Sequence, residues 1–340
     1  MLVKRKKLFA SLLIFLSLAI ISWFILFEYS VRWLEKGIEE FTSNLRHKGY
    51  IVSYSKVVIA GNPFLLTVTF QNPHMKDPKG RFDWQGQEMV IVIQPWQPFT
   101  FTSTFPGDQK LIVPQNTPIP LGVLKFEGAE GIFSLTSRGT LEEVNFTIDS
   151  ISSFMGDQPQ PVSLGDTSLN IKNLINPLNL SFLLTTHVVN LEKTLGLPPR
   201  DAPFTVDLEA TLSGYQSKYA MPKSLAEWRD GGGVLEVGLL KFTWPPLMLE
   251  ANGTLTLDRN MYPLGAFSSK VIGYQDALAD IVKLGWVKKK NAAGISFILG
   301  LFSVQDEGGG KHLPVPITIQ NKALSVGPAK LFKLRPLEGF

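Results

Sequence analysis

The sequence predicts a mainly β protein of the β-rich α+β class, in which an N-terminal transmembrane helix and an amphipathic helix precede a long antiparallel sheet with a few C-terminal helices. Three observations predict it. An uncharged apolar run extends from Leu8 to Phe27, apolar residues then recur at helical spacing as far as Leu45, and from Tyr50 they alternate with the two-residue period of strands. Turn residues separate the alternating segments at short intervals, which favours a meander over alternating strand–helix units.

The start of the chain has the pattern of a membrane anchor. Segment 1–7 is basic, with four adjacent cations at positions 4 to 7, and the run 8–27 that follows has no charge. A helix of that length crosses the roughly 30 Å hydrocarbon core of a bilayer. The positive-inside bias places the N-terminus in the cytoplasm and the bulk of the chain outside it. A cleaved signal peptide is the alternative, but its apolar region is only about 7 to 15 residues long and ends at a small-residue cleavage site, which this run lacks.

An amphipathic helix is predicted over 28–48. Its apolar residues recur at spacings of three and four, with charged residues on the remaining faces. Gly49 stands where helices commonly end. The apolar stripe consists of Val31, Leu34, Ile38, Phe41 and Leu45. Because this stripe needs a partner, the helix either continues the anchor outward or folds back onto the first strands.

The first β-rich half is assigned to 49–190. Its strand candidates alternate in polarity and are separated by Gly, Asn, Asp and Pro. They cover 51–59, 64–71, 89–93, 99–105, 121–127, 131–137, 140–148, 163–171 and 178–189. A short helix and a break are expected at 190–203.

The second β-rich half is assigned to 191–340. Strands are predicted over 204–212, 234–244, 247–251 and 254–258, with two final strands between 313 and 328, and a helical turn is predicted near 224–229. Asn252-Gly253, between two alternating runs, is the strongest hairpin signal in the chain. The prolines near the C-terminus favour edge positions in the sheet.

Helices are predicted near 275–304. The segment 275–288 places its apolar residues on one face. The apolar run 292–304 is too short to span a bilayer and is predicted to be a buried helix. A segment that dips into a membrane is the alternative, and the basic stretch Lys288-Lys289-Lys290 beside it favours that alternative.

Charge and composition exclude several function classes. The net charge of +4 results from 33 Lys and Arg against 29 Asp and Glu, and the four cations of segment 1–7 account for all of it. The rest of the chain is neutral, so nucleic acid is not an expected partner. The chain has no cysteine, which excludes disulfides, thiol nucleophiles and cysteine-ligated metals. This composition suits a bacterial periplasm better than a disulfide-dense secreted module.

Residues with a recognisable catalytic, cofactor-binding or metal-binding pattern are not found. The four histidines, at positions 47, 74, 187 and 312, stand far apart, and none belongs to a paired-histidine helix motif. The glycine run 308–310 before Lys311 lacks the other residues of a phosphate loop. The carboxylate pairs 142–143 and 306–307 flank turns, where solvated charge is expected. We therefore predict no catalytic residue, no cofactor, no metal and no enzymatic activity.

Several short patterns resemble one family. They are Tyr50-x-x-Ser53-Tyr54 with Gly61-x-Pro63-Phe64, Pro95-Trp96-x-Pro98, Gly253-x-Leu255-x-Leu257-Asp258 with Pro263-Leu264-Gly265, and Leu313-Pro314-Val315-Pro316-Ile317 with Gly327-Pro328. Over nearly the whole chain they resemble an alphaproteobacterial family catalogued as domain of unknown function twenty-one twenty-five. Asn62 and the ending Leu334-Arg335-Pro336-Leu337 depart from its pattern.

The resemblance implies a protein anchored by a single helix in a bacterial inner membrane, with its bulk in the periplasm. More loosely, the chain is similar to AsmA-type envelope proteins, whose long sheets curl into lipid-holding grooves, and this similarity implies a curved sheet. The leading hypothesis is therefore a non-enzymatic binding or scaffold module that handles lipid or another apolar envelope component. The first alternative is a purely structural protein of envelope assembly whose partners are other envelope proteins. A membrane-tethered hydrolase is the third class, for which no nucleophile and base are visible. An open apolar groove favours the first function and a closed sandwich favours the second.

Overall fold

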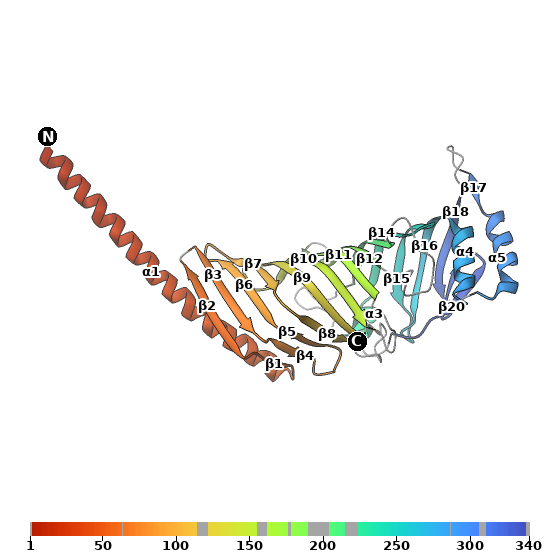
Figure 1. Ribbon diagram of the computed structural model, residues 1–340, viewed down its shortest axis with the longest axis horizontal. Helices are drawn as coiled ribbons and strands as arrows, with labels where there is room; N and C mark the ends of the chain where they lie inside the picture. The colour runs from red at the N-terminus through yellow and green to blue at the C-terminus, as the bar shows by residue number, and fades with distance from the viewer. Residues whose placement is uncertain are drawn as a thin grey trace.

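A long helix and one large sheet make up most of the protein (Figure 1). The computed structural model describes residues 2–62, 64–113, 122–154, 162–175, 178–189, 204–214, 224–285, 287–305 and 311–337. Within these residues the strands form a single antiparallel sheet, and three shorter helices lie toward the C-terminal half. The predicted class, mainly β with an N-terminal helix and a few later helices, is confirmed.

Helix α1 (Leu2–His47) runs without a break from the basic flank to the first strand. Its 46 residues correspond to about 69 Å, more than twice the thickness of a bilayer core. It is long and apolar enough to cross a membrane, and its apolar part is not buried in the rest of the chain. The amphipathic segment therefore continues the apolar segment as one helix, and its C-terminal end lies against β1 and β2. The helix ends at His47, and Gly49, with a φ of +87°, follows it as the sequence predicts.

The sheet begins with four strands that are each divided in two by a bend. The pairs are β1 (Ile51–Ser53) with β2 (Lys56–Asn62), β3 (Leu65–Gln71) with β4 (His74–Lys76), β5 (Asp83–Gly86) with β6 (Glu88–Gln94), and β7 (Gln97–Phe105) with β8 (Gln109–Val113). On one side of the bend the order is β2–β3–β6–β7, on the other it is β1–β4–β5–β8, and both sets join β9 (Gly122–Leu135). Left-handed backbone at Asn72, Gly107 and Gly128 marks this bend. Glycine tolerates such φ values without steric cost.

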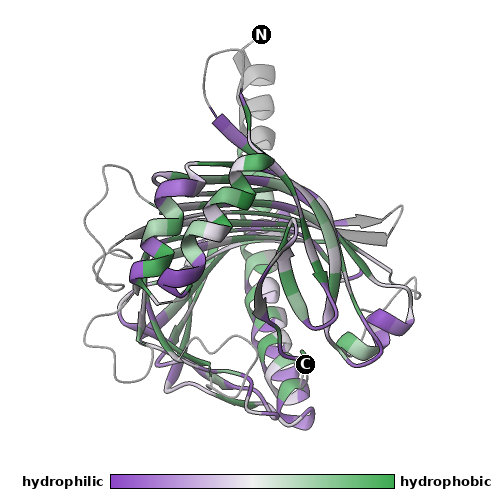
Figure 2. Cartoon of the chain, turned by 90° about the vertical axis from the view of Figure 1, so that its right-hand side faces the viewer, coloured by the Kyte–Doolittle hydropathy of each residue, from purple (hydrophilic) through white to green (hydrophobic). Residues whose placement is uncertain are grey.

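From β9 onward the strands follow one another in chain order, and each pairs antiparallel with the next. They are β10 (Leu141–Phe154), β11 (Val162–Ile175), β12 (Leu178–Val189), β13 (Phe204–Ser213), β14 (Val234–Trp244), β15 (Leu247–Leu257) and β16 (Pro263–Ile272). Next to β16 lies β18 (Lys311–Gln320), which also pairs with β17 (Val304–Gln305) and β19 (Ala323–Val326), and β20 (Ala329–Lys333) completes the sheet. The β12–β13 pairing joins the two β-rich halves into one sheet. Viewed along the molecule, the sheet curls into a trough (Figure 2).

Three short helices are inserted between strands. Helix α3 (Leu225–Asp230) is capped by Ser224, whose hydroxyl accepts a hydrogen bond from the Glu227 amide. Its buried Trp228 donates from Nε1 to the Ser213 carbonyl at 2.8 Å. Helices α4 (Tyr274–Lys283) and α5 (Lys289–Leu301) lie between β16 and β17 and pack on the end of the sheet. The core between these helices and the sheet contains Val271, Tyr274, Leu313 and Val315, with Leu247, Leu249, Leu299 and Val326 packed against it.

Two predictions about individual segments are wrong. Asn252-Gly253 is not a hairpin but lies inside β15, and the chain turns instead at Pro245-Pro246. Gly253 is needed there because a Cβ atom would lie 2.2 Å from the Ala266 carbonyl oxygen of the next strand. The run 292–304 is not a buried helix, since no residue of α5 is buried.

The bounds of two other predicted elements differ from those in the structure. The separate strands predicted at 121–127 and 131–137 are one strand, β9, which bends at Gly128 instead of ending there. The helix predicted at 275–288 ends at Lys283. The segment 190–203 lies outside the described residues.

The edge position predicted for the C-terminal prolines is met only locally in β18, which pairs with β16 on one side and with β17 and β19 on the other. Pro314 and Pro316 face β16 on one side. On the other side β17 stops opposite His312 and β19 starts opposite Ile317. The missing N–H groups of these prolines therefore cost the sheet no ladder hydrogen bond.

Candidate functional site

The register of the sheet places apolar side chains from successive strands on the same face. Residues directly opposite each other in paired strands point to the same side. One row crosses the whole sheet and consists of Ile59, Val68, Ile91, Ser103, Gly131, Phe146, Leu169, Leu184, Leu208, Leu240, Ala251, Ser269 and Val315. A second row, two residues away, consists of Leu66, Ile93, Phe101, Phe133, Val144, Ile171, Phe182, Ala210, Val237, Gly253, Phe267, Ile317 and Val326. Neither row contains a charged residue. We call this side of the sheet the apolar face.

The opposite side, the polar face, has the reverse character. The row that flanks the first apolar row, on the side away from the second, carries mostly threonines, serines and charged residues from Thr69 in β3 to Asp207 in β13. Toward the C-terminal half it becomes a ladder of alternating charge formed by Asp207, Lys241, Glu250 and Lys270. Opposite charges on neighbouring strands stabilise the pairing and keep this side solvated. The polar face is therefore the outside of the protein.

The apolar face is the inner side of the curve. On β9 and β10, Ala129 and Val144 are only 4% and 8% exposed, whereas Glu130 and Asn145, which point the other way, are exposed. Ring contacts lead to the same conclusion. Phe105 of β7 lies 5.9 Å from Phe146 of β10 although β9 separates the two strands. Side chains from strands that are not neighbours converge only on the concave side of a sheet.

The middle of this concave face is left partly open. Valines and small residues of the two rows are buried along the whole sheet, as with Val68 at 1% exposure in β3, Val237 at 7% in β14 and Val315 at 3% in β18. Between them, Leu184, Leu208 and Leu240 remain half-buried. A closed sandwich would bury these side chains beneath a second sheet. The structure instead forms an open trough with an apolar floor, and α4 and α5 pack on that floor at the C-terminal end (Figure 2).

Aromatic side chains lie where the trough meets α1. The ring of Trp23 in α1 is 5.8 Å from that of Phe64, which lies at the β2–β3 turn, and Phe64 is 6.2 Å from Trp96 at the β6–β7 turn. Phe64 and Trp96 are 64% and 52% exposed, although both are large and apolar. Trp23 belongs to the apolar run that fits a bilayer. These two turns therefore lie beside the C-terminal part of the apolar run of α1.

A buried ion pair fixes the joint between α1 and the sheet. The Asp77 carboxylate, in the β4–β5 turn, is fully buried and accepts hydrogen bonds from Arg81 Nη2 at 2.6 Å and Nε at 2.9 Å. The Arg81 hydrogen bonds are the main reason that the pKa of Asp77 is lowered to about 2. The same turn approaches the end of α1, because a Cβ atom on Gly49 would lie 3.1 Å from Pro78. This turn, held by its internal ion pair, therefore packs beside the C-terminal end of α1.

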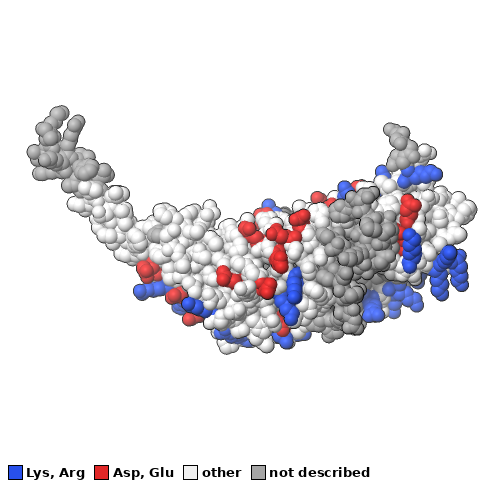
Figure 3. All heavy atoms as spheres, in the orientation of Figure 1, with Lys and Arg blue, Asp and Glu red and all other residues white. Residues whose placement is uncertain are grey.

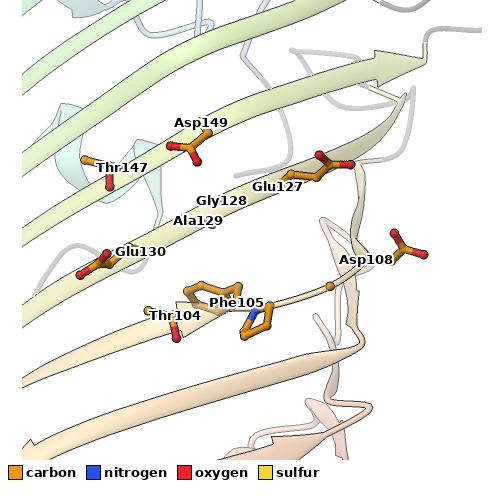
Figure 4. A pocket seen from close by; sticks show the side chains of 11 residues that line it. Thr104, Phe105, Asp108, Glu127, Gly128, Ala129, Glu130, Thr147 and Asp149 are labelled. Carbon is orange, nitrogen blue, oxygen red and sulfur yellow. The ribbon is translucent and has the colours of Figure 1, made fainter.

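An acidic notch lies on the polar face, at the bend of β7, β9 and β10 (Figure 4). Its volume is about 580 Å³, and its carboxylates are Asp108, Glu127, Glu130 and Asp149. Acidic side chains gather over the middle of the sheet on this side (Figure 3). Sequence reasoning missed this notch because the bend brings together residues that no spacing relates. Among the described residues, no group of three or more His, Asp and Glu side chains has the arrangement to hold a metal ion.

The histidines and carboxylate pairs singled out in the sequence take part in local contacts. His74 Nε2 lies 2.9 Å from Asp83 Oδ1, and His187 Nδ1 lies 3.8 Å from Asp166 Oδ2. Glu143 accepts a hydrogen bond from the Asn170 amide at 3.0 Å, which lowers the pKa of Glu143. His47 ends α1 and His312 lies in β18, far from the others. The glycine run 308–310 and the pair 306–307 lie outside the described residues.

One comparison with known proteins gives a match. A family described as an uncharacterized protein conserved in bacteria (DUF2125) matches residues 29–335, so the match starts directly after the apolar run and covers almost all of the body. Comparison with curated proteins and with solved structures finds no similar chain. The family resemblance found in the sequence is thus confirmed, and the family description assigns no activity.

Proposed function

We propose that this protein, which belongs to the bacterial DUF2125 family, is a non-enzymatic module that holds lipid acyl chains in the apolar trough of its sheet. The observation that carries the proposal is the pair of uncharged rows that cross the whole sheet on its concave face. In the middle of the trough the large side chains of Leu184, Leu208 and Leu240 are half-buried rather than covered. Apolar surface of this extent in contact with water marks a site that is occupied by an apolar partner.

Burial of acyl chains against this apolar surface is favourable. Each methylene group transferred from water to an apolar surface contributes about 0.8 kcal/mol, so a chain that buries six methylenes gains about 5 kcal/mol. Among the described residues, the two rows that line the trough carry no charge that would orient a polar ligand. A lipid headgroup would then remain in water at the open side of the trough.

The proposed place of the trough in the cell rests on α1 and its basic flank. We propose that α1 crosses a bacterial inner membrane once, with its basic start in the cytoplasm and the sheet in the periplasm. The cations of segment 1–7 support this orientation. The exposed rings of Phe64 and Trp96 would then touch the outer leaflet of that membrane. Lipid could pass from this leaflet to the apolar face without crossing open water.

The charge ladder on the polar face argues against the purely structural alternative. A structural layer stacked on the outer side of the sheet would have to desolvate Asp207, Lys241, Glu250 and Lys270, which is costly even for paired charges. A partner that covers the inner side would have to be narrow enough to enter the trough. A lipid chain meets that requirement without any further protein layer.

Site-specific photo-crosslinking in cells tests the proposal. A photoreactive amino acid is placed at Leu208, on the apolar face, or at the neighbouring Glu209, on the polar face. Lipid bound only to α1 cannot react at either position, so an adduct reports on the trough alone. We expect a phospholipid adduct at position 208 and none at position 209.

A second pair of variants sets the control. Leu240 lies directly opposite Leu208, whereas Leu239, its neighbour in sequence, lies opposite Glu209. Leu240→Glu places a carboxylate on the trough floor and should remove the adduct at position 208, and Leu239→Glu should leave it unchanged. An absence of lipid at position 208 in the folded protein, or equal adducts at 208 and 209, would show that the trough does not hold lipid.

A further inference from the structure

Helix α5 exposes large apolar side chains at the end of the molecule opposite to the N-terminus (Figure 1). Phe297 and Leu301 are both 68% exposed, and Phe302 and Val304 are both 49% exposed. No residue of α5 is buried, whereas the neighbouring α4 buries Tyr274, Ala277, Leu278 and Asp280. The outer side of α5 is therefore a second apolar surface that no described residue covers, separate from the apolar rows of the trough.

The exposed residues form one stripe along α5. Lys290, Phe297 and Leu301 are spaced by seven and four residues, which places them on the same side of a helix that turns about 100° per residue. The other side of α5 faces the sheet, since Leu299 packs against the C-terminal core. The outer stripe thus begins with a cation and continues with large apolar side chains.

Three adjacent lysines lie at the N-terminus of α5, where they do not stabilise the helix. Lys288 is the residue before the first turn, Lys289 and Lys290 open that turn, and all three are exposed. The first turn contains no acidic residue and no side chain caps it. The amide dipoles at a helix N-terminus disfavour cations. A triplet of lysines at this position is therefore explained better by an external anion than by helix stability.

We propose that α5 and Lys288–Lys290 dock on an anionic lipid surface. The apolar stripe would enter the boundary between headgroups and acyl chains, and the lysines would bind the phosphates, as in amphipathic helices that lie in a membrane surface. Charge favours lipid over a second copy of the chain, because two such helices would bring two lysine triplets together. Basic side chains gather at this end of the protein (Figure 3). The proposal does not depend on whether the trough holds lipid.

The lack of cysteine in the chain allows a direct test on the full-length protein. Phe297→Cys carries an environment-sensitive fluorophore, and Asn252→Cys, exposed on the polar face of β15, carries the same label as a control. The protein is embedded through α1 in nanodiscs of neutral lipid or of neutral lipid mixed with phosphatidylglycerol. Vesicles of the anionic mixture are then added to the neutral nanodiscs. We expect label 297, but not label 252, to report an apolar environment when anionic lipid is present.

The two lipid experiments show which membrane α5 contacts. If label 297 responds in anionic nanodiscs without added vesicles, α5 touches the bilayer crossed by α1. If it responds only when anionic vesicles are added, α5 touches a second membrane. Either outcome supports docking. No response to either lipid, or a response that depends on protein concentration without anionic lipid, overturns the proposal.

Charge variants test the role of the lysines. Replacing Lys288, Lys289 and Lys290 with Gln should weaken binding to anionic lipid on the order of one hundredfold, since each lysine near such a surface contributes about a factor of five. The same replacement at Lys79, Lys172 and Lys330, which are exposed elsewhere, should change it less than about twofold. Equal binding of anionic lipid by both triple variants would show that Lys288, Lys289 and Lys290 do not bind the phosphates. It would also overturn the choice of lipid as the partner of α5.

Discussion

Replacing Asp77 with Asn should destabilise the protein by about 2 kcal/mol at neutral pH. The buried carboxylate accepts two hydrogen bonds from the Arg81 guanidinium, one from the Arg81 amide at 3.2 Å and one from the Lys79 amide at 2.9 Å. These contacts lower its pKa from 3.8 to about 2, and each unit of pKa shift corresponds to about 1.4 kcal/mol. Because the folded-state pKa is the lower one, this stabilisation is complete above about pH 4 and is lost as the pH falls through about 2.

Urea unfolding of the full chain in mild detergent, followed by circular dichroism of the strands, measures this effect. The difference between the parent and Asp77→Asn should be about 2 kcal/mol at pH 7 and should shrink steadily between pH 4 and pH 2. Asp108→Asn, at an exposed position, is the matched control and should change the free energy of unfolding by less than about 0.5 kcal/mol. A difference that stays constant down to pH 2, or none at pH 7, would refute the role assigned to the ion pair.

Three further substitutions test other parts of the structure. Trp228→Ala removes a buried side chain and its hydrogen bond to Ser213, and denaturant unfolding should show a loss of about 3 to 5 kcal/mol. Gly273→Ala places a Cβ atom 1.8 Å from the Pro246 carbonyl oxygen at a residue whose φ is +70°, so unfolding should become easier by more than about 2 kcal/mol; an unchanged midpoint would contradict the close approach. Phe64→Ser, at an exposed turn, should leave the unfolding midpoint unchanged but reduce the lipid adduct at position 208, which would not follow if this turn lay away from the membrane.

The sequence contained enough information to predict the main elements of the fold. The uncharged run before Phe27 and the helical spacing up to Leu45 predicted α1, and the change of period at Tyr50 predicted where the strands begin. These signals are local, because a helix or strand shows its period within a few residues. The family resemblance was also found from short local patterns.

The wrong predictions concerned features that depend on distant contacts. Asn252-Gly253 has the composition of a tight turn, but Gly253 is small because the neighbouring strand passes close to it. The run 292–304 has the composition of a buried helix, but the sheet has no second layer to cover its outer side. The acidic notch depends on a bend at Gly107 and Gly128 that aligns residues from separate strands. None of these contacts leaves a period or a spacing in the sequence.

The alternation of apolar and polar residues predicts a sheet with one apolar face, yet it does not predict what covers that face. A closed sandwich and an open trough have the same alternation, since in both cases every second residue points inward. Small residues along the apolar rows indicate how this sheet bends. At Gly131, a Cβ atom would lie 2.6 Å from the Phe133 ring and 2.7 Å from the Phe146 ring. Phenylalanines converge over this glycine because the strands curve toward each other on that side. The same small residue that permits the curvature thus makes room for these rings on the floor of the trough.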